Sequence, residues 1–191
     1  MALYGGALAA ISACASLASP DLPKEYLDQQ TAATITTVGR PMVLARDPRE
    51  QPATDPHDYL TVAAAAVDRS GIIEYVLIVY PWLSLYESKG GASERDIVPL
   101  TLAADERRIT LPLQGRSAQE TGLGTPVHAP FESLTMRPYV YRTDLATLRI
   151  LAEASHITVL SHAEDMRVAY VTMYDERASL RALVEQLSRG N

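Results

Sequence analysis

The sequence has little of several residue types on which small folds and active sites often depend. Its single cysteine, Cys14, excludes a disulfide framework and any metal site built from several cysteines. The only asparagine is Asn191, so the chain has no Asn-Gly hairpin turn and no N-glycosylation sequon. The longest apolar run, residues 75–83, is too short to cross a bilayer as a helix. The fold must therefore rest on its own hydrophobic core.

The sequence also lacks a cluster of basic residues. The net charge is −6 at pH 7, and the 17 lysines and arginines never form a run of five. Nucleic acid and anionic membrane surfaces are therefore poor candidates for partners. With 191 residues, of which 47% are hydrophobic and 21% charged, the chain can bury a core of its own, as one domain with appendages.

The clearest structural signal is a hairpin in residues 58–82. The first predicted strand, 59–67, is apolar on both faces and contains four consecutive alanines, and the second, 72–80, is largely β-branched or aromatic. A strand that is apolar on both faces lies inside a sheet that is covered on both sides. The alanines predict an element, most simply a helix, packed closely over this hairpin.

The other elements follow from alternation, turn residues and helix caps. A helical turn is expected at 24–28, an exposed loop at 47–57 and a mobile loop at 83–96. Residues 115–130 are expected to form a long structureless loop, which is either functional or disordered. Strands are predicted at 33–38, 42–46, 97–103, 108–114, 133–142, 167–174 and through Ile157 and Val159. Pro99 and Pro112 remove ladder donors and favour a sheet edge for two of these strands.

Two similar segments mark the C-terminal third. ATLRILAE at 146–153 resembles ASLRALVE at 178–185, and each follows a predicted strand. Helices are expected from Asp144 and from Asp175 to about Gly190. The predicted fold is therefore α+β: a mostly antiparallel sheet or sandwich, strongly curled, of about eight strands with two helices in the C-terminal region.

No catalytic or metal-binding motif stands out. The four histidines do not show the paired spacing of a zinc site, and Ser155-His156 and Ser161-His162 are sequence neighbours that point to opposite faces of a strand. Phosphate-loop and dinucleotide fingerprints are missing as well. No cofactor, no metal and no catalytic residue is therefore predicted. An active site assembled from distant residues stays open, and a deep pocket holding His57 or His128 beside a carboxylate would favour it.

Tyrosine is the unusual residue, with ten copies against one phenylalanine and one tryptophan. Tyrosine buries area and keeps a polar tip, so clusters of it suit binding surfaces and the edges of a core alike. The loops 83–96 and 115–130 would present such a surface. The candidate binding residues are Tyr80, Trp82, Tyr86, Tyr139, Tyr141 and His128.

The first nineteen residues carry no charge, and an apolar segment at 3–13 ends in Ile11-Ser12-Ala13-Cys14. This tetrapeptide resembles the lipobox of bacterial lipoprotein precursors. The resemblance implies a signal peptide at 1–13, lipidation of Cys14 and a tether at 14–30 before a globular domain at 31–191. Ala15 in place of aspartate implies forwarding to the periplasmic face of the outer membrane.

The leader departs from the lipoprotein class in its charge. A signal peptide begins with a positively charged region, whereas the first basic residue here is Lys24. The alternative is a cytosolic interaction or structural protein whose N-terminus is ordered, with Cys14 as a small buried hydrophobe. The sequence favours a non-enzymatic envelope lipoprotein that binds or scaffolds a partner, most simply another envelope protein.

Overall fold

The computed structural model describes residues 21–49, 57–83, 97–130, 137–163 and 166–190. These residues form eleven strands of one sheet, together with three helices. The helices are α1 (Ala118–Thr121), α2 (Leu145–Glu153) and α3 (Arg177–Arg189). The strands are β1 (Lys24–Asp28), β2 (Ala33–Thr37), β3 (Met42–Arg46), β4 (Asp58–Arg69), β5 (Ile72–Leu83), β6 (Leu100–Ala104), β7 (Arg107–Leu111), β8 (Leu113–Gly115), β9 (Tyr139–Thr143), β10 (Ile157–Ala163) and β11 (Met166–Tyr174).

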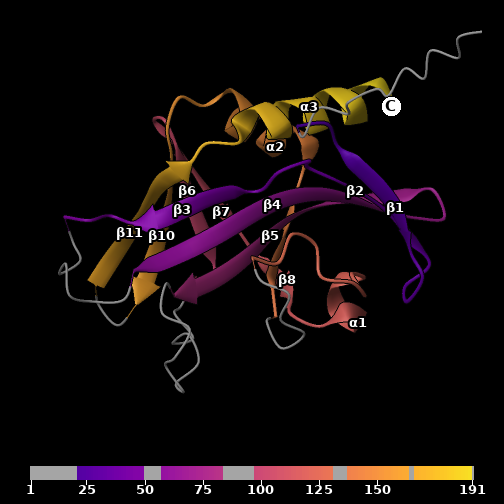
Figure 1. The fold of residues 1–191 in the computed structure, drawn as a ribbon, viewed down its shortest axis with the longest axis horizontal. Coiled ribbons are helices and arrows are strands. Elements are labelled where there is room, and N and C mark those ends of the chain that lie inside the picture. The colour runs from indigo at the N-terminus through magenta and orange to yellow at the C-terminus, as the bar shows by residue number, and fades with distance from the viewer. Residues whose placement is uncertain (1–20, 50–56, 84–96, 131–136, 164–165, 191) are drawn as a thin grey trace, which may run out of the picture.

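The sheet is antiparallel throughout and curls until it is nearly closed and barrel-like (Figure 1). Its main path runs β7-β6-β10-β11-β3-β4-β5-β9-β8. β7 and β8 follow each other along the chain with Pro112 between them, yet β7 pairs with β6 and β8 with β9, at opposite ends of the path. Pro112 lacks a backbone N–H, and it stands where the strand changes partners.

The predicted hairpin forms the centre of this sheet. β4 and β5 pair over their whole length, from Asp58 opposite Leu83 to Arg69 opposite Ile72. Ser70 and Gly71 both have positive φ, at 55° and 86°, as a tight hairpin turn requires. β2 and β3 pair with successive halves of β4 on its other side. The hairpin therefore has neighbours on both edges.

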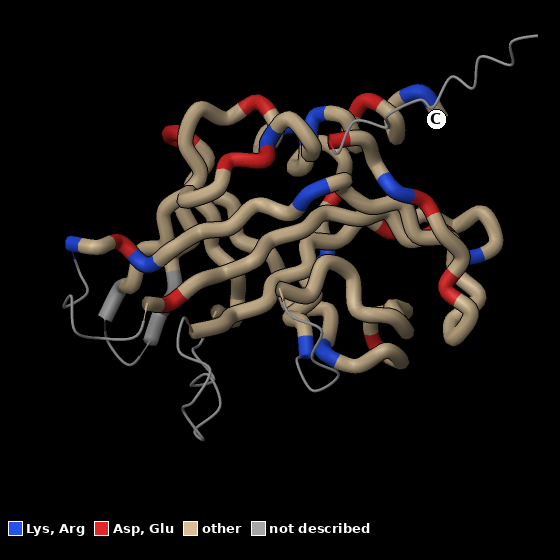
Figure 2. The backbone as a smooth tube through the Cα atoms, in the orientation of Figure 1, with Lys and Arg blue, Asp and Glu red and all other residues tan. Residues whose placement is uncertain are grey.

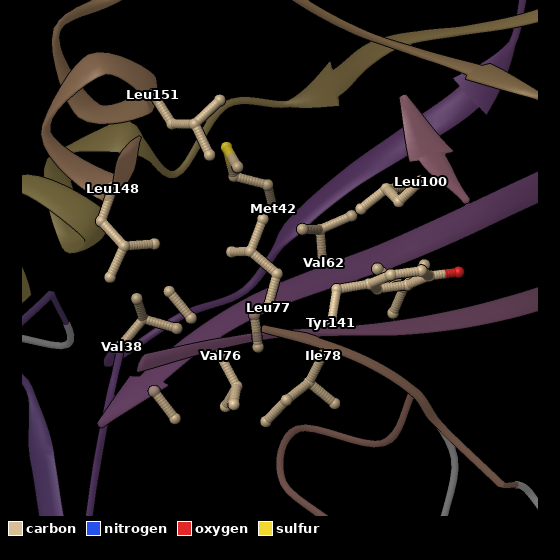
Figure 3. Close-up of a cluster of buried hydrophobic side chains, with 14 of the residues drawn as sticks. Val38, Met42, Val62, Val76, Leu77, Ile78, Leu100, Tyr141, Leu148 and Leu151 are labelled. Carbon is tan, nitrogen blue, oxygen red and sulfur yellow. The ribbon is translucent and has the colours of Figure 1, made fainter. Parts of the chain in front are cut away.

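One face of the hairpin lies on the concave side of the curled sheet and faces α2 and α3. In Figure 3, Leu148 and Leu151 of α2 lie across from Met42, Val62 and Leu77 of the sheet, and all five side chains are buried. On the same face, Ala64, Leu77 and Leu180 of α3 line one narrow gap, so a helix does pack over the alanine run. An alanine there leaves room for the leucine of the helix.

The other face of the hairpin is covered by residues 116–130. This segment contains α1, whose Ser117 and Glu120 form a capping box, and its Leu123 and Val127 are buried. The prediction of a structureless loop at 115–130 is therefore wrong for this stretch. Burial on both faces of β4 is confirmed, with every residue from Leu60 to Val67 buried.

The sequence put the total at about eight strands and placed nine of them individually, and two differences raise the number to eleven. Lys24–Asp28 forms β1, paired with β2, where the sequence predicted a helical turn. The predicted strand at 108–114 divides at Pro112 into β7 and β8. The mostly antiparallel α+β class is confirmed, and α1 adds a helix to the two expected ones.

The C-terminal third follows its predicted order of strand, helix, strand, strand and helix. Asp144 caps α2 by accepting a hydrogen bond from the Thr147 amide at 2.6 Å. The residue at the start of α3 is Glu176, which makes no capping bond, while Asp175 binds Arg177. The two helices then pack against each other above the sheet (Figure 1).

Candidate functional site

An aromatic cluster lies on the outer face of the sheet, at the end of the central hairpin farthest from its turn. Tyr59 of β4 and Trp82 of β5 are directly opposite in the strand register. Their rings stack with centroids 4.3 Å apart and planes inclined by 21°. The ring of His57 meets Tyr59 edge-on at 6.5 Å. We refer to His57, Tyr59 and Trp82 as the aromatic cluster.

A buried threonine fixes the orientation of the tryptophan. Thr61, two residues after Tyr59 on the same strand face, is 2% exposed, and its hydroxyl accepts a hydrogen bond from the Trp82 indole N–H at 3.0 Å. A cross-strand aromatic pair contributes on the order of 0.5–1 kcal/mol to a sheet. The stack and the hydrogen bond thus fix the cluster within the fold. Its tyrosine and tryptophan are partly exposed, and His57 is exposed.

Charged residues surround the strand ends beside the cluster. Asp58, 3% exposed, forms an ion pair with Arg46 of the neighbouring strand at 3.6 Å. Asp47 pairs with Arg49 at 2.7 Å, and this hydrogen-bonded guanidinium lowers the pKa of the Asp47 carboxyl. These pairs are structural partners that position the ends of β3 and β4.

Three of the predicted binding residues, Tyr80, Tyr139 and Tyr141, lie in the core and not in the aromatic cluster. Tyr80 and Tyr141 are 0% exposed and Tyr139 is buried too, so in this structure they offer no surface to a partner. Burial raises the pKa of Tyr80 to about 12, and it raises the pKa of Tyr141 further. Tyr141 donates its hydroxyl hydrogen bond to the Ile97 carbonyl at 2.6 Å. These three tyrosines pack in the core. The abundance of tyrosine in the sequence was compatible with this role as well as with a binding surface.

His128 serves to hold the segment 116–130 in place. Its Nε2 donates to the Val38 carbonyl at 2.7 Å, and its backbone has a positive φ of 54°. Burial lowers the pKa of the imidazole, which favours the neutral ring. His128 therefore links this segment to the end of β2. Tyr86 and Cys14 lie outside the described residues.

Asp28 is an anchoring residue that sequence reasoning missed. It ends β1, is 1% exposed, and accepts hydrogen bonds from the amides of Gln30 and Gly124 and from the hydroxyl of Thr31. Burial alone would raise the pKa of Asp28, but these hydrogen bonds outweigh it and the pKa lies below its ordinary value. No pattern in the sequence joined Asp28 to a glycine almost a hundred residues away.

The aromatic cluster presents partly exposed rings at the end of the central hairpin. Over the part of the chain that the structure describes, no group of three or more histidine, cysteine, aspartate or glutamate residues could hold a metal ion. None of the described helices is both long and apolar enough to cross a membrane. Tryptophan and tyrosine, together with arginine, are the residues enriched among those that contribute most to binding at protein interfaces.

Comparison with known proteins gives no family: no protein-family model matches the chain, and no curated protein or solved structure is significantly similar to it.

Proposed function

We propose that the protein is a non-enzymatic lipoprotein of the bacterial envelope, anchored through Cys14, whose folded domain binds another envelope protein through the aromatic cluster. The anchoring half of the proposal rests on the uncharged leader and its Ile11-Ser12-Ala13-Cys14 ending. The binding half rests on one structural observation, the stacked and hydrogen-bonded Trp82.

Three properties of the cluster support a binding role. Its aromatic side chains are fixed by cross-strand stacking and by Thr61, so little side-chain entropy would be lost when a partner binds. The cluster stands on the rigid central hairpin instead of on a loop. The cluster is also accessible to a partner, because Tyr59 and Trp82 are partly exposed and His57 is exposed.

Site-specific photo-crosslinking tests the binding half. A photo-reactive amino acid placed at Tyr59 in cells is expected to give a discrete crosslinked envelope protein, because this ring lies at the proposed contact. Replacing Trp82 with alanine in the same chain should abolish that product. The matched control carries the photo-reactive residue at Arg108, an exposed position on β7. A product that appears equally at both positions, or that survives Trp82→Ala, would contradict the aromatic cluster as the binding site.

The anchoring half has its own control. Membrane fractionation of the full chain is expected to place the wild type with membranes and Cys14→Ser with the unanchored fraction. If the wild type and Cys14→Ser were both found in the unanchored fraction, anchoring through Cys14 would be rejected. The crosslinking experiment would still test the binding site independently.

A further inference from the structure

The two similar C-terminal segments place equivalent charged residues in one groove. Arg149 and Glu153 on α2 correspond to Arg181 and Glu185 on α3 in the aligned stretches ATLRILAE and ASLRALVE. In each helix the arginine and glutamate are four residues apart and share a face. Since α2 and α3 pack against each other, both pairs line a single groove between them. Its remaining lining residues are Ala152, Val184, Ser188 and Arg189.

The charges in this groove are only partly used by the fold. Arg149 donates to the Ser188 hydroxyl at 3.2 Å, and Arg189 forms an exposed pair with Glu185 at 3.4 Å. By contrast, the side chains of Arg181 and Glu153 form no hydrogen bond and no ion pair with another described residue, although the charge of Arg181 contributes to lowering the pKa of Asp175. One groove thus presents a guanidinium and a carboxylate whose hydrogen-bonding atoms have no partner among the described residues. Figure 2 shows both signs of charge along the α2–α3 layer.

The groove also lies beside the start of the folded domain. The Ser179 hydroxyl on α3 donates to the Asp21 carbonyl at 3.1 Å, and Leu22 and Pro23 lie along α3. Glu185 and Arg189 line both this contact and the α2–α3 groove. The chain from Cys14 to Asp21 spans at most about 25 Å in any conformation. A lipid on Cys14 would therefore keep this side of the domain next to the membrane.

We propose that the α2–α3 groove binds the phosphoethanolamine headgroup of a membrane phospholipid. The arginines at 149 and 181 would hold the phosphate, since a guanidinium matches phosphate oxygens with paired N–H donors. The carboxylate of Glu153 would accept hydrogen bonds from the ammonium group. A zwitterionic ligand would give hydrogen-bond partners to both the guanidinium of Arg181 and the carboxylate of Glu153, whereas a simple anion would serve only the guanidinium. The inference deepens the proposed function, because the anchor at Cys14 is what brings the groove to the membrane.

The first test uses the soluble full chain with Cys14→Ser and an NMR titration with O-phosphoethanolamine. Amide shifts are expected at Arg149, Arg181 and Ser188, with much smaller shifts for inorganic phosphate or ethanolamine at the same concentration. Arg181→Gln and Glu153→Gln should each weaken binding about tenfold, the loss that one charge-assisted hydrogen bond gives. Arg108→Gln, an exposed arginine on β7, is the charge-matched control and should bind as the parent does.

Vesicle flotation then separates a membrane headgroup from a free phosphate compound. The Cys14→Ser protein should float with vesicles of phosphatidylethanolamine and phosphatidylcholine but not with phosphatidylcholine alone, whose ammonium has no hydrogen to donate. Equal flotation with both, or titration shifts that inorganic phosphate reproduces and Glu153→Gln leaves unchanged, would overturn the proposal. Because Cys14 is replaced throughout, this result is independent of lipidation. Failure of anchoring would appear only with the cysteine-containing chain, as loss of membrane fractionation.

Discussion

Replacement of Asp28 by alanine tests how the segment 116–130 is held on the sheet. This carboxylate accepts hydrogen bonds from the amides of Gln30 and Gly124 and from the Thr31 hydroxyl, and its side chain is buried. Each hydrogen bond to a charged group contributes about 1.5–3 kcal/mol when it is considered alone. The donors are exposed or partly exposed and regain hydrogen bonds to water after the replacement, so the contributions of the three hydrogen bonds do not add fully. We expect Asp28→Ala to lower the free energy of unfolding by about 3 kcal/mol.

The pH dependence of that loss follows from the lowered pKa of Asp28. Because the folded-state pKa lies below the unfolded value of about 3.9, the stabilisation is complete above that pH. It is lost as the pH falls through the folded-state pKa. The difference in unfolding free energy between wild type and Asp28→Ala should therefore stay constant from about pH 7 to pH 5 and shrink below about pH 4.

Urea unfolding followed by circular dichroism measures both effects, and hydrogen exchange of the Gly124 amide reports on the local contact. Glu106→Ala is the matched control, since this exposed carboxylate in the β6–β7 turn makes no hydrogen bond with another described residue. If Asp28→Ala were as stable as this control and the Gly124 amide stayed protected, the hydrogen bonds to Asp28 would not hold the segment.

Three further predictions concern the core and the aromatic cluster. Tyr141→Phe should lower the free energy of unfolding by about 1–2 kcal/mol in urea, because the Ile97 carbonyl loses its donor. Ala64→Leu should lower it by about 1–3 kcal/mol, because the added side chain meets Leu180 of α3, and an unchanged midpoint would show that the helix does not pack there. Trp82 is the only tryptophan, so Tyr59→Ala should shift its fluorescence emission while leaving far-ultraviolet circular dichroism unchanged; an identical spectrum would contradict the stacking.

The elements that the sequence predicted well are those whose own residues carry the pattern. β4 and β5 are apolar on both faces because both faces are buried. The polar turn from Asp68 to Gly71 separates the two strands. The same holds for α2 and α3, where buried leucines recur with helical spacing. The spacing of apolar residues along an element indicates which of its faces are buried. In these four elements the buried faces follow from their position inside the sheet or packed against it.

The elements that it missed depend on partners far along the chain. Lys24–Asp28 has too few apolar residues to predict a strand, and it becomes β1 because β2 offers it an edge. The segment 116–130 shows no alternation, and its order comes from Asp28, Val38 and the buried Leu123 and Val127. Tertiary contacts of this kind leave little local trace in a sequence.

The candidate site shows the same limit. Tyr80 and Trp82 share the outer face of β5, and composition gave no reason to separate them. The structure buries Tyr80 completely, whereas Trp82 lies two residues farther along and stays partly exposed beside Tyr59. The histidine and tyrosine at positions 57 and 59 were not predicted as members of the binding surface, although strand pairing with Trp82 would have pointed to Tyr59.

The most direct test of the envelope assignment is the intact mass of the mature protein expressed from its native upstream region in a Gram-negative host. The account predicts a chain that begins at Cys14 and carries the additional mass of lipid, recovered with the membranes. An unmodified chain that retains Met1 and stays in the soluble fraction would contradict it.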